Sequence, residues 1–312
     1  MSSTNNNVRF YLGDCIEMME QHVTNASIDL IYLDPPYDSN KVYTMSVTNT
    51  AGFNDKWKGN EYSLFLKKVI DTCKKKLKPT GTLYLHISAT GMYVPEQILR
   101  ETFDYVQPIF WKKCRAKNCV KQMFGTVIDI LFKCNTQKKD VTFHVVQQPK
   151  TETYLKNGFK NKDEKGAYAL GHVITEPTKK GYIYEFEFNG KKYNPVSGWR
   201  ISKEELEKLR VENRLHVPKT DRATKVYKKI YLNEFEGKAC TDLWDDISCI
   251  AKGNELRQYP TAKPYKLLER IVKVSSNEGD TILDPMCGSG VMGRVCADLN
   301  RHCILCDKQQ MV

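Results

Sequence analysis

The sequence of 312 residues lacks any apolar run of about eighteen residues, so no segment is expected to cross a membrane. Residues 1–8 are polar and lack the apolar stretch of a secretion signal, so we expect a cytoplasmic protein. Eleven cysteines are scattered along the chain, and in a reducing compartment we expect them to remain free thiols rather than to form disulfides.

Cysteine and histidine pairs at metal-binding spacing are also lacking. Cys114 and Cys119 have no second pair at a zinc-like distance. Cys303 and Cys306 follow His302, but on a strand these two thiols would point to opposite faces. We therefore expect no metal site.

Positive charge is abundant, with a formal net charge of +11, which indicates a polyanionic partner. Residues 111–139 carry eight basic side chains against one acidic side chain. Such a run is often only a solvated face, but a field this concentrated favours phosphate binding. The candidate nucleic-acid contacts are Lys112, Lys113, Arg115, Lys117, Lys121, Lys179, Lys180 and Arg200.

The order of expected strands and helices predicts an α/β fold with a doubly wound, mostly parallel sheet. Strands and helices alternate in residues 1–146 and again in residues 238–312. Residues 147–237 differ, because they are charged and rich in glycine and tyrosine, with short strands and one helix that opens on a capping box at Ser202 and Glu205. We expect two α/β halves with an insert between them.

The first candidate motif is Asp34-Pro35-Pro36-Tyr37, which follows the apolar strand 28–33. Ligands of open α/β sheets bind at the carboxyl ends of strands. The prolines stiffen the loop, so that Asp34 and a backbone carbonyl can accept hydrogen bonds from an amino group, and Tyr37 offers a flat face to a base. A turn with a capping aspartate is the plainer interpretation.

The second motif, residues 284–290, is a glycine-rich loop between a strand and a helix. Its residues are Asp284, Pro285, Met286, Cys287, Gly288, Ser289 and Gly290. The glycines allow a ligand to approach the backbone, and the helix amino terminus suits a carboxylate. Asp307, at the end of the next strand, stands where an acid binds ribose hydroxyls in nucleotide-binding sheets.

Together the two motifs resemble those of the amino-methyltransferases, a family of DNA-modifying enzymes. Their order, with the tetrapeptide first and the glycine-rich loop last, resembles the circularly permuted β group. Residues 259–264 resemble the family's approach to the cofactor loop, and residues 198–202 and 242–247 resemble adenine-specific members, including type III modification subunits. The resemblance implies the S-adenosylmethionine-dependent methyltransferase fold, a seven-stranded type of sheet.

The same resemblance implies a role for each matching residue. Asp34 and the Pro35 carbonyl would bind the target amino group, Pro36 would complete the loop, and Tyr37 would stack on a flipped base. S-adenosylmethionine would be bound by Asp14, Thr261, Lys263, Asp284, Met286, Cys287, Gly288, Ser289, Gly290 and Asp307. For Asp14, a helix N-cap is an equally good interpretation.

The expected activity is methyl transfer to N6 of adenine in double-stranded DNA, with the insert 147–237 reading the target sequence. N4 of cytosine is the nearest alternative, and a non-catalytic DNA-binding relative is a third, because Val291-Met292 replace threonines common in the family. The sequence leaves open a homodimer and a restriction partner.

Overall fold

The computed structural model describes residues 7–38, 41–44, 51–114, 124–149, 152–218, 225–250 and 262–308. The chain divides into two compact units, one of residues 1–146 and 239–312 and one of residues 147–238. None of the described helices has the length and apolar character needed to span a bilayer.

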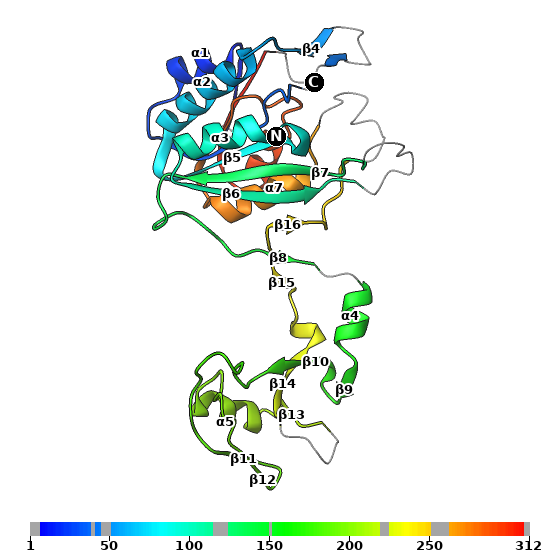
Figure 1. Ribbon diagram of the computed structural model, residues 1–312. Helices are drawn as coiled ribbons and strands as arrows, with labels where there is room; N and C mark the ends of the chain where they lie inside the picture. Colours follow the sequence, from blue (N-terminus) through cyan, green and yellow to red (C-terminus); the bar gives the residue numbers. More distant parts are fainter. Residues whose placement is uncertain are drawn as a thin grey trace, which may run out of the picture. The chain divides into compact units, whose positions relative to one another are not determined.

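A large sheet forms the centre of the first unit (Figure 1). It has eight strands, in the order β1-β18-β17-β2-β5-β7-β6-β16. All neighbouring pairs are parallel except those of β7, which is antiparallel to both β5 and β6. The large, mostly parallel sheet is therefore confirmed, but it has eight strands rather than the expected seven, because the two-residue β16 pairs with β6 at its edge. Its strands are β1 (Val8–Leu12), β2 (Ile28–Leu33), β5 (Leu77–Ser88), β6 (Tyr105–Lys112), β7 (Ile128–Asn135), β16 (Leu243–Trp244), β17 (Thr281–Asp284) and β18 (His302–Asp307).

Helices cover both faces of this sheet because β2 is apolar on both sides. On one face, Ile31 and Leu33 pack in a core with α1 (Cys15–His22), α2 (Glu61–Lys76) and α3 (Tyr93–Thr102). On the other, Leu30 and Tyr32 pack with α7 (Tyr265–Ser275) and α8 (Val291–Asp298). Burial of both faces is typical of parallel sheets.

One local prediction is wrong. Residues 78–81, Lys-Pro-Thr-Gly, indicate a turn, but β5 runs continuously from Leu77 to Ser88. Against β2 the register jumps, so that Leu77 pairs with Ile28 and Thr82 with Leu30. The turn-forming residues are accommodated as a bulge in a long strand, which sequence alone does not distinguish from a true turn.

A short hairpin follows the Asp-Pro-Pro-Tyr motif, with β3 (Lys41–Thr44) antiparallel to β4 (Ala51–Asp55). No strand is predicted from the sequence in this hairpin. It places Asp55, the last residue of β4, beside the candidate catalytic loop.

The second unit has its own core, built around the fully buried Trp199 and the buried Leu206. Its sheet has the order β13-β14-β10-β9, and a separate hairpin joins β11 to β12. The expected helix is present, and the Ser202 side chain caps it by accepting from the Glu205 N–H at 3.3 Å. The elements are β8 (Gln147–Gln148), α4 (Glu152–Gly158), β9 (Asn161–Asp163), β10 (Gly166–His172), β11 (Phe186–Phe188), β12 (Lys191–Tyr193), α5 (Lys203–Val211), β13 (Leu215–His216), β14 (Tyr227–Tyr231) and β15 (Lys238–Ala239).

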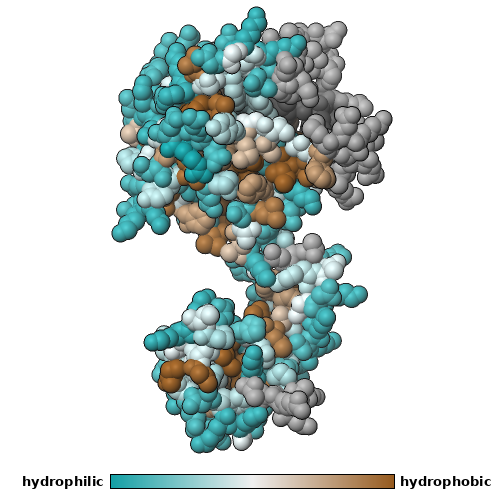
Figure 2. Space-filling view, in the orientation of Figure 1, coloured by the Kyte–Doolittle hydropathy of each residue, from teal (hydrophilic) through white to brown (hydrophobic). Residues whose placement is uncertain are grey.

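Polar side chains cover most of the visible surface of each unit, interrupted by small apolar patches (Figure 2). This distribution is ordinary for a water-exposed protein. The site is therefore better located by the pocket at the end of the sheet than by a surface patch.

Candidate active site

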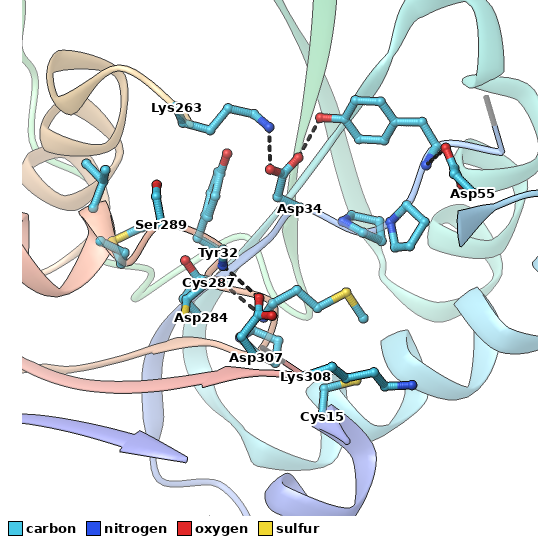
Figure 3. A pocket seen from close by; sticks show the side chains of 18 of the residues that line it. Cys15, Tyr32, Asp34, Asp55, Lys263, Asp284, Cys287, Ser289, Asp307 and Lys308 are labelled. Carbon is cyan, nitrogen blue, oxygen red and sulfur yellow. Dashed lines mark hydrogen bonds and ion pairs between the residues drawn. The ribbon is translucent and has the colours of Figure 1, made fainter. Parts of the chain in front are cut away.

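A pocket of about 480 Å³ opens at the carboxyl ends of β2 and β17, which are hydrogen-bonded neighbours in the sheet. Both sequence motifs follow these strands, so they meet across the pocket (Figure 3). The predicted residues that line it are Asp34, Pro35, Pro36, Tyr37, Lys263, Asp284, Met286, Cys287, Gly288, Ser289 and Asp307.

Two side chains of the pocket hold the Asp34 carboxylate. The Tyr37 hydroxyl donates to its Oδ1 at 2.5 Å, and the Lys263 ammonium forms an ion pair with its Oδ2 (Figure 3). Burial and the Asp34 charge raise the pKa of Tyr37 well above its usual value, so this phenol stays protonated as a donor. Asp34 is thus an ionic acceptor held in place from two sides.

Lys263, an expected cofactor contact, lines the pocket and also makes a contact that was not expected. Its ammonium forms an ion pair with the Asp34 carboxylate. The same ammonium lies 5.6 Å from the centre of the Tyr37 ring, a cation–π distance. Residue 263 precedes α7, more than two hundred positions from Asp34, and nothing in the local sequence indicates this contact.

Asp55 is a site residue that the sequence analysis missed. Its carboxylate accepts from the backbone N–H groups of Tyr37 at 3.2 Å and Asp38 at 3.0 Å, and from the Trp57 indole at 3.1 Å. The side chain is buried, so these hydrogen bonds hold the loop after the two prolines. The sequence Asp55-Lys56-Trp57 indicates this role only once the hairpin that carries Asp55 is known.

Asp284 lies at the base of the pocket and is almost completely buried. Burial and the nearby Asp34 charge raise its pKa well above the usual value of a carboxyl group. Its carboxyl group accepts a hydrogen bond from the Met286 N–H at 3.3 Å. Such a carboxyl group is suited to a cationic ligand, which would restore its charge.

The glycine-rich loop adopts a conformation that few other residues tolerate. Gly288 and Gly290 have φ values of +53° and +73°, in the left-handed region. The Gly288 N–H donates to Asp307 Oδ2 at 2.8 Å, so the loop and the acid at the end of β18 form one structure. The loop therefore presents bare backbone to the pocket.

Two other predicted cofactor residues lie outside the lining of the pocket. Asp14 caps α1 by accepting from the Ile16 N–H at 3.0 Å, and Lys308 pairs with it at 3.1 Å. The helix-cap interpretation of Asp14 is thus confirmed, and its neighbours Gly13 and Cys15 line the pocket instead. Gly290 is the N-cap residue of α8. Thr261 lies outside the described residues.

The expected phosphate-binding residues differ in their contacts. Lys112 and Lys180 are exposed. Lys113 instead donates to the buried Asp129 at 2.6 Å. Lys179 and Arg200 both pair with Glu176, at 3.1 and 3.0 Å. Arg115, Lys117 and Lys121 lie outside the described residues. Lys113 is therefore engaged within the fold.

The cysteines of the described ranges are free thiols. Cys303 and Cys306 belong to cores on opposite faces of the sheet, as the strand spacing predicts. In the same ranges, no cluster of three or more His, Cys, Asp or Glu could hold a metal ion.

An open α/β sheet whose strand ends carry an acceptor loop and a glycine-rich loop defines a class of nucleotide-cofactor enzymes. The chain belongs to the N6/N4 DNA methylases, because the model of this DNA methylase family matches residues 28–311.

Individual relatives are more distant. The chain is 27% identical over 277 residues to the Type II methyltransferase M.EcaI of Enterobacter cloacae, an alignment of 86% of this chain and 59% of that protein. It is 23% identical over 283 residues to the DNA adenine methyltransferase YhdJ of Escherichia coli, covering 91% of this chain and 72% of the relative. The chain thus spans about 60% of the length of M.EcaI.

The fold is similar to that of PvuII DNA methyltransferase, a cytosine-N4-specific enzyme. The TM-score is 0.53 at 13% identity, with 98% of this chain and 83% of the other covered. This likeness shows a shared fold.

Proposed function

We propose that this chain is a DNA methyltransferase that transfers a methyl group from S-adenosylmethionine to N6 of adenine. The observation that supports this most is that Asp34 and the glycine-rich loop face each other across one pocket, on adjacent strands. An acceptor for an amino group therefore lies beside a site suited to a nucleotide cofactor.

The mechanism follows from the poor nucleophilicity of the amino group, whose lone pair is delocalised into the base. The target base must first leave the duplex, at a cost of about a few kcal/mol. Asp34 and the Pro35 carbonyl then accept the two amino hydrogens and direct the lone pair out of the ring plane. Asp34 stabilises the positive charge that develops on nitrogen and takes the departing proton.

The residues of the pocket fit S-adenosylmethionine, which when bound supplies an electrophilic methyl group. Asp284, buried with a raised pKa, would face positive charge, and Gly288 leaves room for close approach. Asp307 would hold the ribose hydroxyls, while Met286 and Cys287 would form apolar contacts. Lys263, whose ammonium forms an ion pair with Asp34, would also bind the carboxylate of the methionine moiety.

We expect cofactor binding to release protons from Asp284. In the free protein its raised pKa favours the protonated form, and a bound cation lowers that pKa. Calorimetric titration with S-adenosylmethionine in buffers of different ionisation enthalpy should give a release of up to one proton. The release should be largest between the lowered pKa of the complex and the raised pKa of the free protein, and should vanish above and below this range.

Asp284→Asn is the matched control, because it keeps the shape but cannot titrate. An equal proton release from this variant would assign the titration to another group and remove the argument for Asp284 as the cation-binding acid.

The choice of adenine rests on the aspartate of the tetrapeptide and on the family resemblance. Incubation with labelled cofactor and duplex DNA, followed by nucleoside analysis, tests it. N6-methyladenine is expected. N4-methylcytosine would establish the alternative base, and no methylated nucleoside on any DNA would leave a non-catalytic relative.

We also propose that the unit of residues 147–238 recognises the target sequence. It carries 20 basic and 13 acidic residues, a net charge of +7 that accounts for most of the excess charge of the chain. Tyr182 and Ile183 are 58% and 70% exposed on it, beside the exposed Lys180. Cations that bind phosphates and exposed side chains that reach bases are both needed in such a region.

Exchange of this unit tests its role. A chimera that carries the corresponding unit of a related enzyme should methylate the relative's sequence, because positioning and reading would move with it. Methylation sites can be mapped on genomic DNA by sequencing that detects the modified base. An active chimera that still modifies the original sites would place recognition in the other unit, with residues 111–139 as the next candidate.

The order of the motifs supports a circularly permuted arrangement as a further proposal. β1 and β18 are parallel neighbours, with Val8 opposite Cys303, so the first and last strands are adjacent. The Type II relative supports a place in a restriction-modification system.

A further inference from the structure

Behind Asp34 lies a buried row of polar side chains that the mechanism above does not use. Tyr32, His86 and Asp129 are between 0% and 4% exposed and come from three strands, β2, β5 and β7. Buried polar groups are costly unless they are paired. Most of their neighbours on this face of the sheet are apolar, including Leu30, Ile109 and Leu131.

His86 is the centre of this row. Its Nδ1 lies 2.8 Å from the Tyr32 hydroxyl and 3.9 Å from Asp34 Oδ1, and its Nε2 lies 3.4 Å from Asp129 Oδ2. Nε2 makes no hydrogen bond within the described residues, but the acceptor that faces it is the Asp129 carboxylate, so the imidazole tautomer with hydrogen on Nε2 suits this environment. Nδ1 is then left to accept from Tyr32.

The charges around His86 favour its neutral form. Burial lowers its pKa, and the Lys263 charge adds to this effect, although Asp34 and Asp129 oppose it. Burial disfavours ionisation of Asp129, but its contacts with His86 and Lys113 hold its pKa below the usual value. The remaining neighbours are rings, Tyr37 at 6.1 Å and Trp111 at 5.5 Å between centroids.

We propose that His86 is a positioning residue for methyl transfer. Buried between Tyr32 at Nδ1 and the Asp129 carboxylate that faces Nε2, it orients the Tyr32 hydroxyl at the base of the pocket and keeps an uncharged ring edge behind Asp34. Asp34 Oδ1, which accepts from the Tyr37 hydroxyl, thereby receives no competing hydrogen bond from His86 and keeps a lone pair for the target amino group. The inference rests on the proposed function, because it assigns His86 a part in that same reaction.

Three variants of the full chain separate positioning from a general structural role. His86→Gln can accept from Tyr32 and donate to Asp129, whereas His86→Leu can do neither. Tyr84→Phe is the matched control, because Tyr84 is also fully buried on β5, two residues before His86, and its hydroxyl bonds Ser275 at 3.0 Å. It removes a comparable hydrogen bond at a greater distance along the strand from Asp34.

The primary measurement is the single-turnover methylation rate at saturating cofactor and DNA, with thermal unfolding to check folding. For His86→Leu we expect a rate loss of about 10- to 100-fold, the size of effect that misplacement of a reacting group produces. His86→Gln and Tyr84→Phe should stay within about threefold of the wild type. Equal losses in His86→Leu and Tyr84→Phe, or none in His86→Leu, would overturn the proposal.

The pH profile gives a second test. Protonation of His86 would place a positive charge behind Asp34 and remove the acceptor of the Tyr32 hydroxyl. Because burial lowers the pKa of His86, the wild-type rate should fall on the acid side only below the usual titration range of histidine, and His86→Gln should lack this step. The same acid step in both proteins would overturn the proposal, whereas a wild type that methylates no DNA would overturn the proposed function itself.

Discussion

Asp34→Ala should reduce the methyl-transfer rate by at least about 100- to 1,000-fold, the range seen when one charge-stabilising group is removed from an active site. The variant leaves the target amino group without its ionic acceptor and leaves the Tyr37 hydroxyl and the Lys263 ammonium without their shared partner. Single-turnover methylation of a duplex that contains the target site measures the loss. DNA affinity should change little, because Asp34 lies in the pocket.

Asp38→Asn is the matched control, since it neutralises an exposed carboxylate four residues away that does not line the pocket. Asn tolerates the positive φ of residue 38. An Asp34→Ala protein that turns over at a tenth of the wild-type rate or faster would exclude Asp34 as the acceptor.

Gly288→Val should weaken S-adenosylmethionine binding by roughly 100-fold, equivalent to about 2.7 kcal/mol. Gly288 lines the pocket with φ at +53°, so a branched side chain would strain the loop and enter the space beside Asp284. Isothermal titration with the cofactor measures the change directly, without reference to methylation.

Gly279→Val is the control for the effect of backbone strain without a change in the pocket. Gly279 has φ at +81° and open space around it, in the turn that precedes β17, at the opposite end of this strand from the pocket. This variant should be destabilised in thermal unfolding yet bind the cofactor normally. Normal affinity in Gly288→Val would move the cofactor site away from the glycine-rich loop.

The strands and helices nearest the site were predictable because their signals are local. The apolar run 28–33 and its terminating prolines predict β2 with the bounds that the structure has. The helical pattern of residues 15–22 likewise predicts α1, and Asp14 is its N-cap, one of the two roles expected for this residue. The two motifs then share an edge of the sheet because both follow parallel strands.

The supporting contacts of Asp34 were not predictable because they join residues far apart in sequence. Lys263 reaches Asp34 across 229 positions. In the sequence His86 is one polar residue in an apolar strand. Its contacts with Tyr32 and Asp129 form only because β5 lies between β2 and β7 in the sheet. Asp55 depends on a hairpin whose residues carry no strong strand signal. The roles of Lys263, His86 and Asp55 therefore follow from their positions in the folded structure.

The pairing of β2 has a consequence for how the chain folds during synthesis. One neighbour of β2 is β5, close in sequence, but the other is β17, with Leu30 opposite Ile282. At about 5–20 residues per second, roughly 10–50 s separate the synthesis of these strands. During that time the fully buried Leu30 and Ile31 have an unpaired strand edge beside them, which is a template for wrong pairing. We therefore expect nascent chains truncated before β17 to aggregate or to bind chaperones.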